Sequence, residues 1–353
     1  MSTSRYTLPV DPTRWALDAT SPVVFDWEYD EGRSRLLALY AKGKSSQWDG
    51  AQRIDWSRDF DPDNPLGIRD EHIFLHGSDV WARLDDKGRA LVRRHLASWQ
   101  ISQFLHGEQG ALVCASRIVE SVPSLDAKLY AATQVMDEAR HVEVFSRLLH
   151  DKVGIAYPLN SHLRTLLAQV LADSRWDMIY LGMQVLIEGL ALAAFSMQRD
   201  FATDPLVRAV NAYVMQDEAR HVAFGRLALR DHYPSLTEAE RGEREEFVVE
   251  ACYLMRDRFL AEEVWTTLDL GAAECAGYVK QSPMMREYQK ILFSRIVPTV
   301  KDIGLWGPKV QAAFADMGVI DFAALNPDDL GMADEAVARA MDELRGLSAP
   351  APA

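Results

Sequence analysis

The sequence predicts an all-α protein whose core is a four-helix bundle. No alternating strand pattern of useful length occurs in its 353 residues. The hexapeptide Asp-Glu-Ala-Arg-His-Val occupies residues 137–142 and recurs unchanged at residues 217–222. The glutamate of each copy lies 30 residues after another glutamate, and this earlier glutamate is in a long apolar stretch. These pairs are Glu108 with Glu138 and Glu188 with Glu218.

The hexapeptide brings a carboxylate and an imidazole to one face of a helix. Glu138 and His141 are three residues apart, as are Glu218 and His221, and residues at this spacing share a helix face. Carboxylate and imidazole groups suit iron or manganese. With the two upstream residues, four glutamates would neutralise two divalent cations. The sequence therefore predicts a site for two metal ions.

The upstream glutamates lie in helices that are otherwise almost uncharged. Apart from His106, Glu108 is the only acidic or basic residue in 96–116, and Glu188 is the only charged residue in 178–198. A buried carboxylate is costly unless it is paired or binds a metal. Such stretches also fit transmembrane helices. However, both contain a central Glu and Gly and lack a Lys/Arg-rich flank, so no membrane span is expected.

Prolines mark the turn within each pair of helices. Pro123 is the midpoint between Glu108 and Glu138, and Pro205 lies near the midpoint between Glu188 and Glu218. Proline ends one helix and can begin the next. About fifteen residues on each side, roughly 22 Å at 1.5 Å per residue, would return the chain to the height of the upstream glutamate. Each unit is therefore expected to be a helical hairpin.

The chain divides into four expected parts. Residues 1–80 form an irregular Trp-rich extension packed on the core, with Trp15, Trp27, Trp48 and Trp56, and we assign no chemistry to it. Residues 81–235 form the four-helix core, 236–347 add C-terminal helices, and 348–353 are a disordered tail. The expected helices are 33–41, 86–122, 125–151, 161–172, 174–201, 205–232, 238–270, 284–302, 307–317 and 334–347.

Composition limits the classes of partner and the compartment. The formal charge of −14 argues against nucleic acid as a partner. It suits a cytoplasmic protein that meets a basic face on a partner. Three cysteines without metal spacing form no disulfide framework, and residues 1–18 lack the apolar segment of a signal peptide. A homodimer is possible.

Other residues near the motifs have expected roles. Asp137 and Asp217 could each accept a hydrogen bond from the histidine of the other unit, which would fix its tautomer. Arg140 and Arg220 could pair with these aspartates, although ordinary surface ion pairs are the alternative. Gln134, Gln184, Tyr130 and Tyr180 also lie near the ligands along their helices. Helical spacing suggests an apolar substrate cavity, or alternatively plain core, formed by Phe104, Ala111, Leu112, Ala115, Phe145, Leu192, Phe195 and Val214.

The double motif with its upstream glutamates resembles the ferritin-like di-iron carboxylate oxygenases, above all the bacterial multicomponent monooxygenase hydroxylases. Acyl-carrier-protein desaturases, R2-like oxidases and arylamine N-oxygenases share parts of the pattern. The resemblance covers about residues 86–232. It implies O2 activation at two iron ions, or at a Mn/Fe pair, held by Glu108, Glu138, His141, Glu188, Glu218 and His221.

Three positions depart from subfamily patterns, so the resemblance assigns no subfamily. Phe145 stands where ribonucleotide reductase small subunits have a radical tyrosine. Leu192 stands where soluble hydrocarbon monooxygenases have a threonine. Val214 stands where arylamine N-oxygenases have an additional histidine.

The expected function is O2-dependent oxidation of a small organic substrate, apolar or aromatic. The electrons would come from a separate reductase or ferredoxin, because the chain has no nucleotide or iron–sulfur motif. C–H hydroxylation, N-oxygenation and desaturation remain open. An R2-like Mn/Fe oxidase and a ferroxidase of the ferritin type are the alternatives.

Overall fold

The architecture is helical throughout the part of the chain that the structure describes. The computed structural model describes residues 7–8, 16–17, 22–26 and 34–344. Within these residues every regular element is an α-, 3₁₀- or π-helix, and none is a β-strand. The predicted all-α class is confirmed. Trp15, Trp27 and the predicted tail at 348–353 lie outside the described residues.

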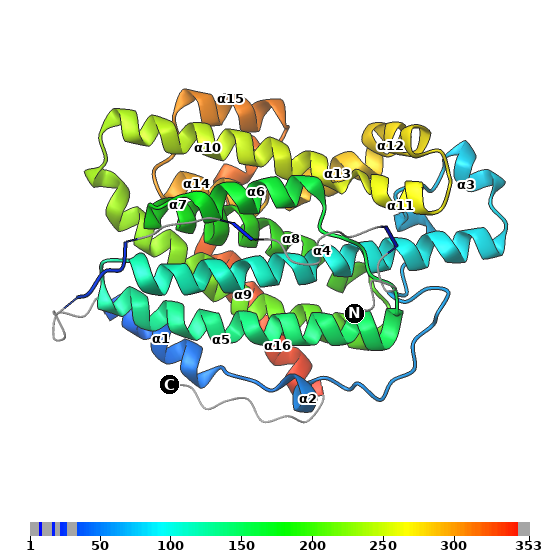
Figure 1. Ribbon diagram of the computed structural model, residues 1–353, viewed down its shortest axis with the longest axis horizontal. Helices are drawn as coiled ribbons and strands as arrows, with labels where there is room; N and C mark the ends of the chain where they lie inside the picture. The colour runs from blue at the N-terminus through cyan, green and yellow to red at the C-terminus, as the bar shows by residue number, and fades with distance from the viewer. Residues whose placement is uncertain (1–6, 9–15, 18–21, 27–33, 345–353) are drawn as a thin grey trace.

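Two helical hairpins form the core, as the prolines predict. The first is α4 (Asp86–Ser121) with α5 (Leu125–Arg147), and the second is α8 (Glu188–Phe201) with α9 (Pro205–His232). The partners of each hairpin pack along each other, and α5 also meets α9 (Figure 1). Asp204 caps α9 by accepting hydrogen bonds from the N–H groups of Leu206 and Val207, at 2.8 and 3.2 Å.

Four expected helices contain interruptions that periodicity does not reveal. The 174–201 segment consists of α7 (Trp176–Tyr180), the π-helix η3 (Leu181–Ile187) and α8. The 238–270 segment consists of α10 (Glu238–Asp257), the 3₁₀ turn η5 (Arg258–Leu260) and α11 (Glu262–Thr267). The third, α5, continues as the π-helix η2 (Leu148–Val153). An apolar pattern fits α- and π-turns alike, so only the surrounding packing distinguishes them.

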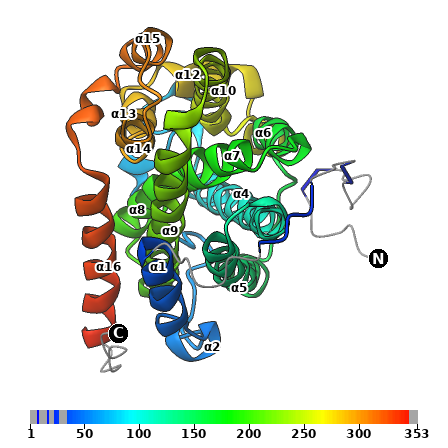
Figure 2. The ribbon, with the colours of Figure 1, turned by 90° about the vertical axis from the view of Figure 1, so that its left-hand side faces the viewer.

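The remaining C-terminal helices cover two sides of the core. The layer containing α10 runs along the upper side in Figure 1, whereas α16 packs on α9 along the left side in Figure 2. The expected helix 284–302 is two helices, because a turn at 293–295 separates them. The C-terminal helices not yet given are α12 (Ala272–Gln281), α13 (Pro283–Leu292), α14 (Ile296–Asp302), α15 (Pro308–Asp316) and α16 (Pro327–Leu344), whereas α6 (Ser161–Ala172) lies between the two hairpins in the chain.

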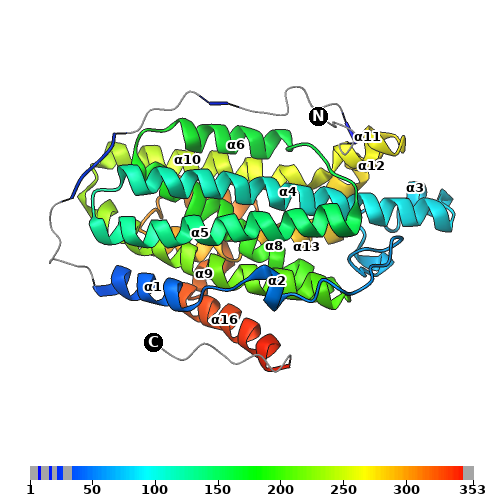
Figure 3. The ribbon, with the colours of Figure 1, turned by 60° about the horizontal axis from the view of Figure 1, so that its bottom comes forward.

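The segment before the bundle contributes short helices and buried tryptophans. These helices are α1 (Ser34–Ser45), α2 (Gly50–Arg53) and α3 (Asp79–Arg83). The first of them packs on α5 and α9, as Figure 3 shows from below. Trp48 and Trp56 are both buried. The segment 47–48 thereby lies beside the two motif-bearing helices.

One stretch has the length and hydropathy of a membrane span. It is Trp176–Phe201, and 94% of its most apolar window is buried inside the protein. Burial in the bundle accounts for this composition, because a helix in a protein core can be as apolar as a membrane-spanning helix.

Candidate metal centre

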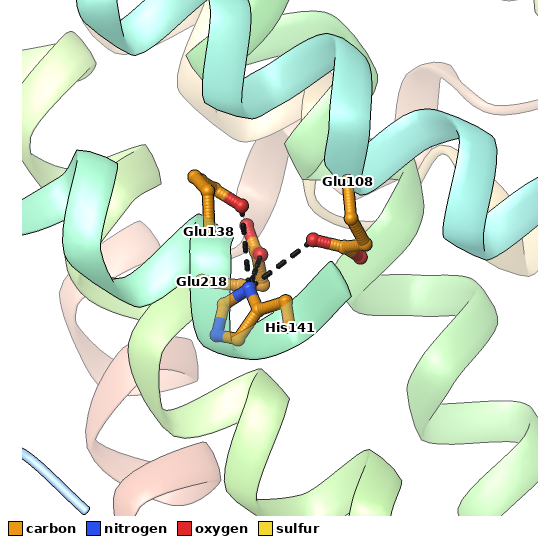
Figure 4. Close-up of side chains that lie close together, drawn as sticks. All are labelled: Glu108, Glu138, His141 and Glu218. Carbon is orange, nitrogen blue, oxygen red and sulfur yellow. Dashed lines mark hydrogen bonds and ion pairs between the residues drawn. The ribbon is translucent and has the colours of Figure 1, made fainter. Parts of the chain in front are cut away.

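The structure brings the six predicted ligand residues together in the bundle core. They come from α4, α5, α8 and α9, and all are buried. They form two sets in which one ligand atom from each residue lies within 4.8 Å of the others. The sets are Glu108, Glu138, His141 and Glu218 (Figure 4), and Glu138, Glu188, Glu218 and His221. Glu138 and Glu218 belong to both sets.

Short distances and unpaired oxygens show that this cluster fits cations. His141 Nδ1 lies 3.1 Å from Glu108 Oε2 and 3.0 Å from Glu218 Oε1. His221 Nδ1 lies 3.0 Å from Glu138 Oε1. One carboxylate oxygen of each of Glu138, Glu188 and Glu218 is buried without a hydrogen-bond partner. Such oxygens are costly to bury unless they bind a cation, and this donor set suits iron or manganese.

The electrostatics of the cluster likewise call for positive charge. Burial raises the pKa of Glu108 and of Glu188, and the nearby Glu218 carboxylate raises both further. Burial opposes the charged form of His141, but hydrogen bonds to Asp217 and the glutamates outweigh it and raise its pKa. In the absence of metal ions, the cluster therefore holds protons in their place.

The aspartates and arginines of the two hexapeptides form a crossed network behind the histidines. His141 Nε2 lies 3.1 Å from Asp217 Oδ2, and His221 Nε2 lies 3.2 Å from Asp137 Oδ2. The guanidinium of Arg140 donates to both aspartates, and that of Arg220 donates to Asp217. A histidine that donates from Nε2 directs the lone pair of Nδ1 at the glutamates, which is the tautomer a metal needs.

Two residues of the N-terminal segment complete this network, which corrects the absence of chemistry assigned to residues 1–80. Trp48 Nε1 donates to Asp217 Oδ2 at 2.8 Å. Gln47 donates from Nε2 to Asp137 Oδ1 at 2.6 Å and accepts from Arg140 Nη1 at 2.7 Å. No spacing in the sequence connects them with the motifs, because the contacts are tertiary.

The glutamines near the motifs also contact the cluster. Gln134 Nε2 donates to Glu188 Oε1 at 2.9 Å and to Glu138 Oε1 at 3.2 Å. Gln184 Nε2 in turn lies 3.4 Å from Gln134 Oε1. The rings of Tyr130 and Tyr180 pack on Phe224, with centroids 4.2 and 5.1 Å away. Gln134 thus contacts two carboxylates directly, Gln184 contacts them only through Gln134, and the tyrosines pack on Phe224.

A small cavity of about 30 Å³ adjoins Glu108, Glu188 and Glu218. Three of the eight predicted pocket residues line it, namely Phe104, Ala111 and Phe195. The other five predicted residues do not line this cavity, namely Leu112, Ala115, Phe145, Leu192 and Val214. Phe145 packs behind the rings of Phe104 and Phe195, at 5.7 and 5.5 Å, and Leu192 lines a different pocket.

The cavity has further walls that helical spacing alone does not identify. Ile187 and Leu190 come from the end of η3 and the start of α8, and Leu163 comes from α6. Arg258 comes from the turn after α10. Since a helix presents different faces to different neighbours, residues one turn apart can line different pockets.

Comparison with known proteins assigns the family. The model of the family described as P-aminobenzoate N-oxygenase AurF matches residues 29–304. The chain belongs to this family. It is therefore an oxidoreductase, an oxygenase with a two-metal cofactor that acts on a small molecule. The match extends well beyond 86–232 and includes Gln47, Trp48 and Arg258. The family match also assigns the subfamily, which the motifs alone leave open.

Solved structures give more distant matches. Two mutants of an R2-like ligand-binding oxidase with an anaerobically reconstituted Mn/Fe cofactor are both 19% identical to this chain. They cover 80% and 79% of it and 96% of their own chains, with TM-scores of 0.44 and 0.47. At these values the likeness carries no argument about cofactor or substrate. No curated protein matches the chain.

Proposed function

We propose that this protein is a di-iron N-oxygenase that oxidises the amino group of a small aromatic amine. The observation that carries the proposal is a pair of buried ligand sets sharing Glu138 and Glu218, beside an apolar cavity, in a chain of the AurF family. The balanced first step is R–NH2 + O2 + 2 e⁻ + 2 H⁺ → R–NHOH + H2O. A separate reductase or ferredoxin supplies the electrons.

In this proposal one ion is held by Glu108, Glu138, His141 and Glu218, and the other by Glu138, Glu188, Glu218 and His221. Four carboxylates balance the charge of two divalent ions. Both ions are iron, with Mn/Fe as the alternative. When bound, they supply the binding and reduction of O2. Val214 cannot coordinate a metal, so the additional histidine expected of arylamine N-oxygenases has no counterpart at this position.

The protein residues orient the ligands and exclude water. Asp137 and Asp217 fix the histidine rings, and Gln134 fixes the Glu188 carboxylate. The rings of Phe104 and Phe195 form an edge-to-face pair at 4.7 Å in the cavity wall. Such a pair offers an aromatic substrate a surface to pack on and keeps bulk water from the metals.

The direct test is product analysis with labelled oxygen. Iron-loaded, chemically reduced protein is mixed with ¹⁸O2 and p-aminobenzoate or p-aminobenzamide, and the products are identified by mass spectrometry. We expect an N-oxidised product that carries ¹⁸O, and its loss in Glu188→Ala. Continued oxidation of added Fe(II) with ferric accumulation and no organic product would instead support the ferroxidase alternative.

The setting of the enzyme is part of the same proposal. The net charge of −14 suits a cytoplasmic protein and a redox partner with a basic face. The three cysteines are free and buried, which agrees with a reducing compartment. Size-exclusion chromatography with light scattering would test the homodimer.

A further inference from the structure

The cavity beside the metal centre, here called the inner cavity, is too small for an aromatic ring. Its volume of about 30 Å³ gives room for about two water molecules. By comparison, an engineered protein cavity that binds benzene measures about 150 Å³. No described residue that lines the inner cavity is exposed to solvent. An aromatic amine therefore reaches the glutamates only if a side chain in the cavity wall moves.

A second cavity of about 130 Å³, here called the outer cavity, is close to the size of a ring and reaches solvent. The helices α4, α8 and α13 each present one face to it, for example Ala97 and Phe104 on α4. Phe201 and Ile291, which are 38% and 39% exposed, give its mouth an apolar surface. The ring of His72 stacks on that of Phe201, with centroids 4.5 Å apart. This mouth suits a flat, apolar molecule.

A polar side chain in the wall of the outer cavity has an unpaired donor. Gln198 is 5% exposed, and its Oε1 accepts a hydrogen bond from Asn211 Nδ2 at 2.9 Å. Its Nε2, however, is buried with no hydrogen-bond partner in the described chain. Buried donors are nearly always paired, because an unpaired one costs stability. Filling a cavity of this volume also stabilises a protein. A ligand with an aromatic ring and a hydrogen-bond acceptor meets both needs.

Phe104 is the one described residue that lines both cavities. It precedes the ligand Glu108 by one helical turn, so both side chains lie on the same face of α4. Its ring contacts the rings of Phe145 and Phe195, with centroids 5.7 and 4.7 Å away. Those two residues are fully buried, whereas Phe104 retains 9% of its accessible surface. The Phe104 ring thus adjoins a cavity on two sides, into which it can rotate.

We propose that the outer cavity binds the aromatic ring of the substrate first, and that Phe104 is the gate through which the ring passes to the inner cavity. This inference rests on the proposed N-oxygenase function. Rotation of Phe104 joins the two spaces and admits a ring, and its return excludes bulk water from the metals. The gate selects by width, because a narrow molecule passes beside the ring and an aromatic molecule waits for the rotation. Phe104 thereby determines specificity without binding a metal.

The test follows the binding of phenol to the oxidised, iron-loaded protein, in which no amine is oxidised. Phenol forms a coloured complex with ferric iron, so stopped-flow absorbance measures how fast the ring reaches the metals. Azide, a narrow molecule that also forms a coloured complex, is the comparison. We expect the phenol rate to level off as the phenol concentration rises, because the outer cavity fills before the slower gate opens. The azide rate should stay proportional to the azide concentration.

Substitutions separate the gate from the outer cavity. Phe104→Leu makes the gate smaller, so we expect the limiting phenol rate to rise about tenfold and the azide rate to change less than about twofold. Phe145→Leu is the matched control, because it makes the same change in a neighbouring ring that lines neither cavity and should leave both rates unchanged. Ala97→Leu fills the outer cavity, so the phenol rate should fall about tenfold and no longer level off, with azide binding kept.

Three results would overturn the inference: a native phenol rate that is absent or stays proportional to concentration, an equal response to Phe104→Leu and Phe145→Leu, or phenol binding unchanged in Ala97→Leu. If Phe104→Leu does not fold, Phe104→Trp decides, since a larger ring should slow phenol and an unchanged rate contradicts the gate. Ala194→Leu, on the α8 wall of the outer cavity, likewise replaces Ala97→Leu. Failure of these tests would reject the gate alone, and absence of an N-oxidised product would reject the proposed function alone.

Discussion

The two motif-bearing hairpins carry the same hexapeptide in different surroundings. Met136, beside the first motif, is 61% exposed, whereas the equivalent Gln216 is 8% exposed. Glu108 lies within the uninterrupted 36-residue helix α4, whereas Glu188 directly follows the π-helix η3. The ligand atoms nevertheless form two corresponding sets. The hexapeptide and its spacing therefore determine the ligand geometry, and the surroundings can diverge.

The supporting contacts show where the two halves differ. Asp217 accepts hydrogen bonds from His141, Arg140, Arg220 and Trp48. Asp137 has a glutamine, Gln47, in place of the tryptophan. The centre is thus symmetric in its ligands and asymmetric in its support. We therefore expect mutations of equivalent ligands to have equal effects and mutations of equivalent supporting residues to have unequal effects.

The largest effect should distinguish the glutamates that belong to both ligand sets from those that belong to only one set. Glu138→Ala and Glu218→Ala each remove a member of both sets, so we expect both ions to be lost. Glu108→Ala and Glu188→Ala should each lose about one ion. Elemental analysis after anaerobic iron loading measures the stoichiometry. Glu143→Ala, an exposed glutamate on α5, is the control, and full occupancy in Glu138→Ala would contradict the ligand assignment.

The next effect compares the two aspartates. Asp137→Ala or Asp217→Ala removes one of the two carboxylates that pair with the buried arginines and leaves one histidine Nε2 without its acceptor, which costs about 3–5 kcal/mol of folding free energy. We also expect metal affinity to fall about 10- to 100-fold. Asp217→Ala should be the worse of the two, because it also orphans the Trp48 N–H. Urea unfolding and metal titration measure both effects, and equal losses would show that the asymmetry has no energetic weight.

A smaller effect should follow from Trp48→Phe. The change removes one donor to the Asp217 carboxylate and keeps an aromatic ring, at a cost of about 1.5–3 kcal/mol. Metal affinity should fall together with stability. Trp56→Phe is the matched control, because Trp56 Nε1 donates to the Gly50 carbonyl at 2.8 Å, away from the metal centre. If both variants weaken metal binding alike, Trp48 has no special connection to the site.

The last prediction concerns the pH dependence of metal uptake in the native protein. Because the pKa values of Glu108, Glu188, His141 and His221 are raised in the metal-free cluster, these groups must release protons when ions bind. Affinity should therefore fall as pH falls, by about tenfold per pH unit for each proton released. Titration with Mn(II) in a weak buffer measures both the metal affinity and the number of protons released. The Glu108→Gln variant should release fewer protons than the native protein when it binds metal. Metal uptake without proton release would contradict the prediction.

The parts of the site that follow from local periodicity could be predicted from the sequence. Glu138 and His141 share a helix face because they are three residues apart, and Pro123 places Glu108 at their height. The all-α class and the two hairpins follow from the same regularities. Periodicity was insufficient for the pocket, where five of the eight predicted residues do not line the cavity, because packing decides which face of a helix meets a given neighbour.

The sequence by itself determined the repeat, the identity of the candidate ligands and the helical hairpins that align them, since all three are encoded within a few helical turns. Only the tertiary structure decided what surrounds them. Trp48 reaches Asp217 across 169 residues, η3 replaces an α-helical segment before Glu188, and Ala261 ends the turn that holds Arg258 at the cavity. These features have no period in the sequence, because contacts between distant segments, rather than local propensity, stabilise them.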